Sequence, residues 1–178
     1  MFSSVKRLAF LSVRNGLIAG VLGFSLLMVL YYIGKHPFLF PIYFDFRLIL
    51  LSVFIVMTLK EFRDDYQEGI LYFGQAMISA FLFTLVFALV ASLLIWAFCF
   101  VVPEFLSNYI LKATEQLKSI QPAIIEQLGK DAYERNLNKL PATNSSDLAI
   151  DYFGKTFIIS LFISIIISVI LRRQPKTP

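Results

Sequence analysis

The sequence predicts an all-α integral membrane protein, a bundle of four transmembrane helices with an extramembrane amphipathic helical segment between the third and the fourth. Composition is the first observation: of 178 residues, 58% are hydrophobic and 16% are charged, whereas soluble domains average about 45–50% and about 25%. The second is a mean hydropathy of +0.74. The third is that the apolar residues stand in long blocks without charges. These observations exclude an ordinary soluble domain, a disordered tail and a disulfide-stapled secreted module.

The first two spans follow from the gaps between charged residues. Residues 15–34 carry no charge, and at about 1.5 Å per residue they reach across a hydrocarbon core of about 30 Å. The first span is therefore expected at 14–34, and its apolar core is longer than that of a cleaved signal peptide. The next charge-free stretch is too short alone, so the second span, 42–60, takes Asp45 and Arg47 into the interface. Since these two residues are two positions apart, we expect no pairing between them, and Arg47 should extend toward the headgroups.

The third and fourth spans follow the same argument. The third block suits one long helix, expected at 73–102, because two spans with a turn would need about 40 residues. The last span, 152–171, requires Lys155 to extend its amine toward the interface. Four spans place both termini on one side of the membrane. Basic residues concentrate near the span ends on that side, including Arg172 and Arg173, so both termini are expected in the cytoplasm.

Residues 103–150 form the extramembrane insert between the last two spans. Apolar residues recur there at helical spacing, which predicts an amphipathic helix bent at Pro122 and stopped at Gly129. Ser145 or Ser146 is expected to cap the last span. The insert is either a hairpin that packs on itself or lies on the membrane surface, or a docking face for a partner or a second copy. The apolar positions that would form this docking face are Leu106, Ile110, Leu117 and Ile120.

The connection between the second and third spans is the densest polar patch of the chain. It contains the candidate interaction residues Arg63, Asp64, Asp65 and Glu68. Three carboxylates of this kind could ligate a hard cation, but no EF-hand-like spacing accompanies them. We therefore expect this segment, the polar turn, to be a solvated turn at the interface. It is also a candidate contact surface for a partner.

Small residues recur at four-residue intervals in three of the spans. Helices in lipid associate through close backbone approach, which small side chains permit. The pattern predicts a tightly packed bundle, joined within one chain or between copies; the alternative is a polar path lined by hydroxyl groups. The positions are Gly16, Gly20 and Gly23 in the first span, Ala76, Ala80, Thr84, Ala88 and Ser92 in the third, and Ser160, Ser164 and Ser168 in the fourth.

The sequence carries no recognisable catalytic motif. It has no His-Glu-x-x-His, no phosphate-binding Gly-rich Lys-Ser/Thr loop, no Gly-x-Ser-x-Gly elbow, and no ionisable residue in the middle of a predicted span. The one histidine, His36, stands in an outer turn, and the one cysteine, Cys99, is interpreted as a small apolar residue of the third span. We expect a protein that is not an enzyme, with no catalytic residue, cofactor or metal. The insert has no basic surplus, so nucleic acid is not an expected partner.

Three segments carry a family resemblance. The stretch 62–76, Phe-Arg-Asp-Asp-Tyr-Gln-Glu-Gly-Ile-Leu-Tyr-Phe-Gly-Gln-Ala, resembles the hallmark of a family of uncharacterised bacterial membrane proteins, domain of unknown function 4199. Pro103-Glu104-Phe105-Leu106 is similar to the family's Pro-Asp/Glu-Phe turn, and Ile170-Leu171-Arg172-Arg173 to its basic tail. The resemblance covers roughly residues 10–173. It implies an inner-membrane protein of Bacteroidota-like bacteria with four spans and a helical insert before the last, and it brings no known activity or binding residues. With both termini in the cytoplasm, the insert is expected in the periplasm.

These observations predict a single membrane domain, 1–178, that acts as a non-enzymatic subunit or scaffold of a membrane assembly. Its expected partners are the lipid bilayer and either a second copy or another membrane protein. The alternative is a small oligomeric channel or transport component, in which Thr84, Ser92 and the serine row (Ser160, Ser164 and Ser168) face a pore. A metal-dependent membrane enzyme that uses the carboxylates of the polar turn is the third hypothesis.

Overall fold

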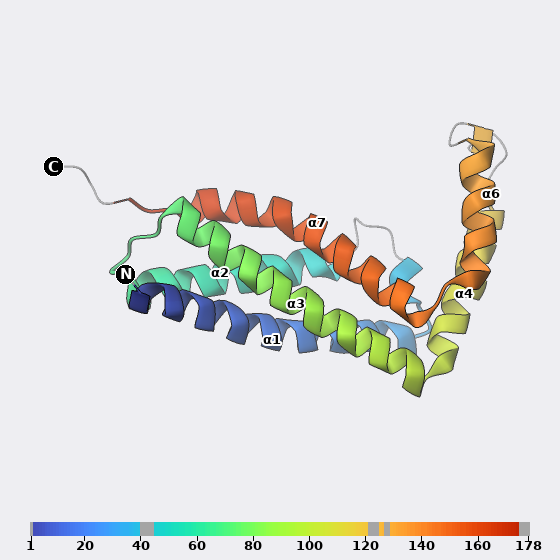
Figure 1. Cartoon of the computed structure of the whole chain (residues 1–178), viewed down its shortest axis with the longest axis horizontal. Helices are drawn as coiled ribbons and strands as arrows, with labels where there is room; N and C mark the ends of the chain where they lie inside the picture. Colours follow the sequence, from blue (N-terminus) through green and yellow to red (C-terminus); the bar gives the residue numbers. More distant parts are fainter. Residues whose placement is uncertain (1, 40–44, 121–124, 127–128, 175–178) are drawn as a thin grey trace.

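Four long helices lie side by side in the computed structural model, which describes residues 2–39, 45–120, 125–126 and 129–174 (Figure 1). Shorter helices lie in the connections. Apart from one isolated bridge between Leu71 and Arg173, the described residues form no β structure, and this confirms the all-α prediction. The long helices are α1 (Phe2–Tyr32), α2 (Phe46–Tyr66), α3 (Phe73–Val101) and α7 (Ser145–Leu171), and the shorter ones are η1 (Pro37–Leu39), α4 (Pro103–Lys118), α6 (Lys130–Lys139) and η3 (Leu140–Ala142).

Three helices of the described chain are long and apolar enough to cross a membrane: Ser4–Tyr32, Phe73–Val101 and Ser145–Leu171. At about 1.5 Å per residue, each is longer than a hydrocarbon core of about 30 Å. The helix α2 is not among them, so the fourth span stays a prediction. The first residues of that predicted span, 42–44, lie outside the described residues.

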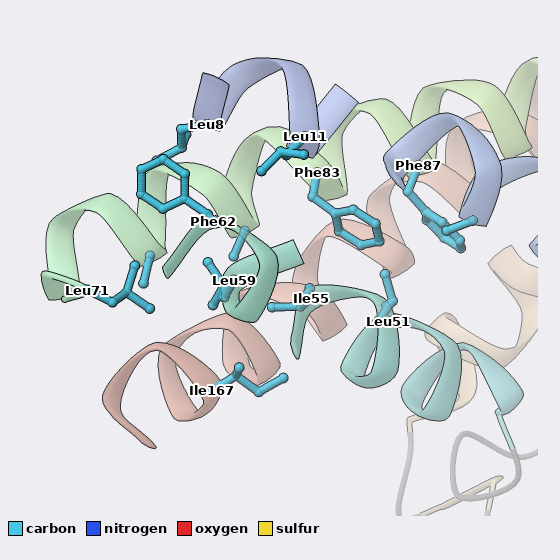
Figure 2. Packing of buried hydrophobic residues seen from close by; sticks show 13 residues of the cluster. Leu8, Leu11, Leu51, Ile55, Leu59, Phe62, Leu71, Phe83, Phe87 and Ile167 are labelled. Carbon is cyan, nitrogen blue, oxygen red and sulfur yellow. The ribbon is translucent and has the colours of Figure 1, made fainter. Parts of the chain in front are cut away.

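A core of apolar side chains fills the space between the four long helices (Figure 2). The side chains of Leu51, Ile55 and Leu59 on α2 have no exposed surface, and they lie in one buried cluster with Phe83 and Phe87 of α3. The outer faces of the long helices are also apolar. Exposed examples are Leu17 and Val21 on α1, Ile78 and Leu93 on α3, and Ile158, Phe162 and Ile166 on α7. A bundle that is apolar inside and outside suits lipid rather than water as its surroundings.

Side-chain caps fix where α2 and α7 begin. Asp45 precedes α2, and its carboxylate accepts a hydrogen bond from the Arg47 backbone N–H at 3.0 Å. Asn144 caps α7 by accepting from the N–H groups of Ser146 and Asp147, and the Asp147 carboxylate accepts from the Asn144 N–H at 2.9 Å. The prediction that Ser145 or Ser146 caps this helix is therefore wrong. Asn144 takes the position because Asp147, three residues later, completes a reciprocal capping box with it.

The insert stands across the end of the bundle opposite to the start of α1 (Figure 1). Pro103 lies in the first turn of α4, where its missing N–H costs nothing. Gly129, predicted as a helix stop, has a φ of +91° and lies directly before α6, so it separates two helical segments. The predicted bend at Pro122 lies outside the described residues.

Candidate functional site

The polar turn after α2 is built around a buried arginine. The Arg63 side chain is buried, and its Nε donates to Asp64 Oδ1 at 2.6 Å while its Nη2 donates to Oδ2 at 3.0 Å. This bidentate hydrogen bond lowers the pKa of the Asp64 carboxyl and raises the pKa of the Arg63 guanidinium. The two most polar residues of the turn are thus partners of each other.

The backbone of this turn reverses through two residues with positive φ. Glu68 has a φ of +50° and Gly69 one of +82°, and the Gly69 N–H donates to the Arg63 carbonyl at 2.9 Å, as in a glycine-terminated helix end. Asp64, Asp65 and Glu68 are exposed. Within the described ranges, no three side chains of the His, Cys, Asp and Glu types form a group that could hold a metal ion. The three carboxylates are not brought together as a cation site.

Three segments distant in sequence meet around the turn. The Leu71 N–H donates to the Arg173 carbonyl, and the Arg173 N–H donates to the Leu71 carbonyl, both at 2.9 Å. On the α1 side, Gln67 donates to the Ser4 hydroxyl, and the Arg7 guanidinium lies 5.1 Å from the centre of the Tyr66 ring. The start of α1, the α2–α3 connection and the residues after α7 therefore form one continuous surface.

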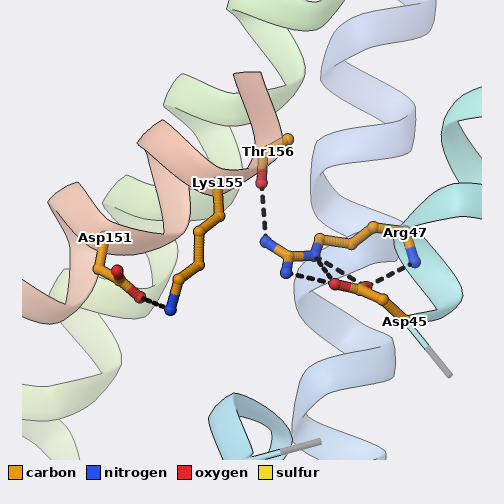
Figure 3. A network of polar contacts seen from close by, with 5 residues as sticks. All are labelled: Asp45, Arg47, Asp151, Lys155 and Thr156. Atoms are coloured by element: carbon orange, nitrogen blue, oxygen red, sulfur yellow. Dashed lines mark hydrogen bonds and ion pairs between the residues drawn. The ribbon is translucent and has the colours of Figure 1, made fainter. Parts of the chain in front are cut away.

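The other half of the bundle holds a nearly buried ion pair (Figure 3). Arg47 Nε lies 2.8 and 2.7 Å from the two carboxylate oxygens of Asp45, and the two side chains are 12% and 11% exposed. Arg47 Nη1 donates to the Thr156 hydroxyl of α7 at 3.1 Å. The guanidinium also lies 4.8 Å from the centre of the Tyr152 ring. A second ion pair, Asp151–Lys155 at 2.7 Å, lies beside it on α7.

The predictions for Asp45 and Arg47 are wrong on both points. The two residues do pair, because Asp45 precedes the helix with extended backbone angles, and the spacing rule for two helical residues does not apply to it. Arg47 does not extend outward, since Asp45 and Thr156 hold its guanidinium between α2 and α7.

The single histidine lies in an aromatic cluster between η1 and α4. The His36 ring is 4% exposed, and its centre lies 4.7 Å from that of Phe105 and 5.4 Å from that of Tyr109. Nε2 is 3.0 Å from the Phe105 carbonyl, and it carries the proton because a carbonyl only accepts. Burial lowers the pKa of His36 to about 4. The sequence indicated a turn here but gave no sign that α4 covers it.

Three of the four apolar positions considered for docking lie beside other parts of the same chain. Leu106 packs with the cluster that contains Phe105 and Tyr109. Leu117 and Ile120 line a groove of about 390 Å³ whose opposite wall includes residues of α6 and η3, among them Asn136, Lys139 and Leu140. Ile110, like these three, is half-buried. Leu117 and Ile120 therefore lie on the side of α4 that faces α6 and η3, and the docking face stays a prediction.

The small residues lie where helices approach closely within the chain. A Cβ atom added to Gly16 would lie 2.9 Å from the Phe83 carbonyl oxygen, and one added to Gly20 would lie 2.8 Å from Val90 Cβ. At Gly23 it would meet the Phe87 ring at 3.0 Å. The small residues of the other two spans are all buried: Ala76, Ala80, Thr84, Ala88 and Ser92 on α3, and Ser160, Ser164 and Ser168 on α7.

Five polar side-chain contacts connect the long helices, two of them between α1 and α2 and one for each other neighbouring pair around the bundle. Hydrogen bonds of this kind hold helices together where water does not compete. The sequence pattern gave no sign that Ser12, Asn15, Thr58, Ser79 and Thr156 make such contacts. The contacts are Ser12–Ser79 at 2.8 Å (α1–α3), Arg14–Glu61 at 2.5 Å and Asn15–Thr58 at 2.9 Å (α1–α2), Arg47–Thr156 at 3.1 Å (α2–α7) and Thr84–Ser160 (α3–α7).

The fold defines an all-α protein with apolar helices of membrane-spanning length, and its polar groups are largely paired with one another. The chain belongs to the family described as "Protein of unknown function (DUF4199)", whose model matches residues 14–173. This match confirms the resemblance found in the polar turn. No curated protein and no solved structure matches the chain.

Proposed function

We propose that this protein is a multi-pass membrane protein with four spans, in which α2 is the fourth, and that it acts as a non-enzymatic subunit or scaffold of a membrane assembly. The observation that carries the proposal is the use of the polar side chains inside the bundle. Each of the five interhelical polar contacts joins two side chains of this chain. Polar groups that form hydrogen bonds or ion pairs with each other hold the helices together, whereas a transport path needs polar groups that face a solute.

The placement of α2 between α1 and α7 supports a fourth span. Its inner face is part of the core, while its outer residues Ile49, Val53 and Met57 are 71%, 47% and 54% exposed. Apolar side chains on both faces suit a helix that has lipid on its outside. The charge of Arg47 is compensated by Asp45 and by the Thr156 hydroxyl, which reduces the cost of placing it near the membrane.

The concentration of basic residues supports cytoplasmic termini. Seven described basic side chains lie in the half of the bundle where α1 begins and α7 ends, and most stand at or just outside the helix ends. Positive charge close to span ends favours the cytoplasmic side. In this orientation the hairpin of α4 and α6 lies outside the cell's inner membrane, in the periplasm, where it is accessible to a partner.

Affinity purification from native membranes in a mild detergent tests the assembly proposal. Particle mass and co-purifying proteins are read together for the wild type and for Glu134→Lys on the exposed face of α6. A stoichiometric companion, lost in the variant, supports a subunit that binds through the hairpin. Solute flux through the reconstituted protein, or turnover of a substrate, contradicts the proposal. A membrane-impermeant thiol reagent on single-cysteine variants at positions 60 and 130 tests the orientation.

A further inference from the structure

The positive charge of the molecule is concentrated at one end. Among the described residues, the half with the polar turn carries seven basic and four acidic side chains, and the half with the insert carries eight of each. In the half with the polar turn, two of the basic residues are neutralised: Arg14 by Glu61 at 2.5 Å and Arg63 by Asp64 at 2.6 Å. Five exposed basic residues remain against Asp65 and Glu68. These five, which we call the basic end, are Lys6, Arg7, Lys60, Arg172 and Arg173.

Main-chain and ring contacts hold this end in place. The two hydrogen bonds between Leu71 and Arg173 fix the residues after α7 beside the α2–α3 connection. The stacking on Tyr66 positions the guanidinium of Arg7. Arg173 and Lys60 act on the same carboxylate, since both lower the pKa of Asp64. The positive groups thus come from three segments of the chain and share one surface.

The basic end borders the apolar outer surface of the bundle. Exposed Phe10 lies one helical turn after Arg7 on α1, and exposed Ile170 lies next to the residues that lead to Arg172. A ligand that covers both the basic end and the apolar surface beside it must carry a negative charge next to an apolar part. A lipid phosphate attached to acyl chains has both, and Arg is well suited to binding phosphate oxygens. Nucleic acid or free phosphate would leave the apolar border uncovered.

We propose that the basic end binds the headgroup phosphates of anionic phospholipids. The inference rests on the proposed function in one respect, namely that the long helices lie in the bilayer. Each basic residue near a membrane surface contributes about fivefold to the affinity for anionic lipid. Replacing Arg172 and Arg173 together should therefore lower the preference for an anionic over a zwitterionic lipid by about 25-fold. The bridge to Leu71 uses backbone atoms only, so it persists when the side chains change.

Native mass spectrometry of the detergent-solubilised full chain tests the proposal, with phosphatidylglycerol and phosphatidylcholine added in equal amounts. The ratio of the two bound lipids is compared for wild type, Arg172→Gln/Arg173→Gln and the matched control Lys130→Gln/Lys139→Gln on α6. We expect wild type and control to prefer phosphatidylglycerol equally, and the arginine variant to lose most of that preference. An equal ratio in all three proteins overturns the inference, as does an equal loss in the control.

Two further measurements distinguish a failure of the lipid-binding proposal from a failure of the proposed function. Inorganic phosphate at the lipid concentration should not displace the lipid; displacement would mean that the site recognises phosphate alone, and would overturn the lipid assignment. Alkaline extraction of proteoliposomes reports whether the chain spans the bilayer. Release of the chain contradicts the proposed function, whereas retention without a preference for anionic lipid contradicts only the present inference.

Discussion

Arg47 of α2 donates to the hydroxyl of Thr156 on α7 at 3.1 Å. The same guanidinium also donates to the carboxylate of Asp45, the residue that precedes α2. One side chain thereby fixes the start of α2 against the first half of α7. The contact is nearly buried, and a charge in such a place is costly unless it is paired. Its removal is therefore a sensitive measure of how the bundle is held together.

Asp45→Asn should destabilise the fold by about 3–5 kcal/mol, because it leaves the Arg47 charge without its counterion. Asparagine caps helices as well as aspartate, so the helix start is preserved. The free energy of unfolding in detergent measures the effect. The matched control is Asp151→Asn, which removes an exposed ion pair and should cost less than about 1 kcal/mol. Equal effects of the two variants would contradict a special role for the buried pair.

Gly20→Ala should destabilise the bundle by about 1–3 kcal/mol, because the added methyl group would overlap Val90 at the α1–α3 contact. Gly74→Ala is the control. A Cβ atom at Gly74 meets nothing within 4 Å, and alanine is the better helix residue, so stability should stay the same or rise. Thermal unfolding of both variants distinguishes tight packing from a general intolerance of larger residues.

Replacing Ser160, Ser164 and Ser168 by Ala should have a small effect, about 0.6 kcal/mol for each hydrogen bond lost between helices. The Thr84 hydroxyl keeps a partner without Ser160, since it also donates to the Ala80 carbonyl at 2.8 Å. Unfolding and solute flux of the reconstituted protein are measured side by side. Abolished flux with unchanged stability would show that the serine row lines a path.

Acid should weaken the end of the bundle that lies next to α4, through His36. Its pKa is about 4 in the fold and 6.5 ordinarily, so the unfolded chain binds a proton between these values while the folded chain does not. The stabilising contribution is complete above pH 6.5 and decreases as the pH falls toward 4, by about 2 kcal/mol between pH 7 and pH 5. Unfolding at both pH values measures it. His36→Gln should remove this difference, and a difference of equal size in the variant would assign it to other groups.

The sequence predicted the parts of this structure that depend on long, uniform stretches of chain. Charge-free blocks show where apolar helices lie, because burying a charge in lipid is costly and charged residues are therefore rare within spans. Small residues four positions apart mark helix faces that approach closely, and Gly16 and Gly20 indeed lie against α3. Both patterns recur several times along the chain, so they can be recognised from the sequence before the structure is known.

The features that the sequence did not reveal depend on single residues or on distant segments. Asp45 and Asn144 act as caps, and the position of a cap is set by where the backbone leaves the helix, which composition does not show. His36 is buried because α4 covers it, and the bridge between Leu71 and Arg173 joins two segments with no shared periodicity. Such contacts exist only after the helices have been arranged.

The bridge between Leu71 and Arg173 also has a consequence for biosynthesis. A chain is made from its first residue onward, so Leu71 has left the ribosome long before Arg173 is available to it. The two main-chain hydrogen bonds can close only when α7 has reached its place beside the other helices. Until that moment the connection after α2 lacks these partners, and their formation marks the completion of the bundle.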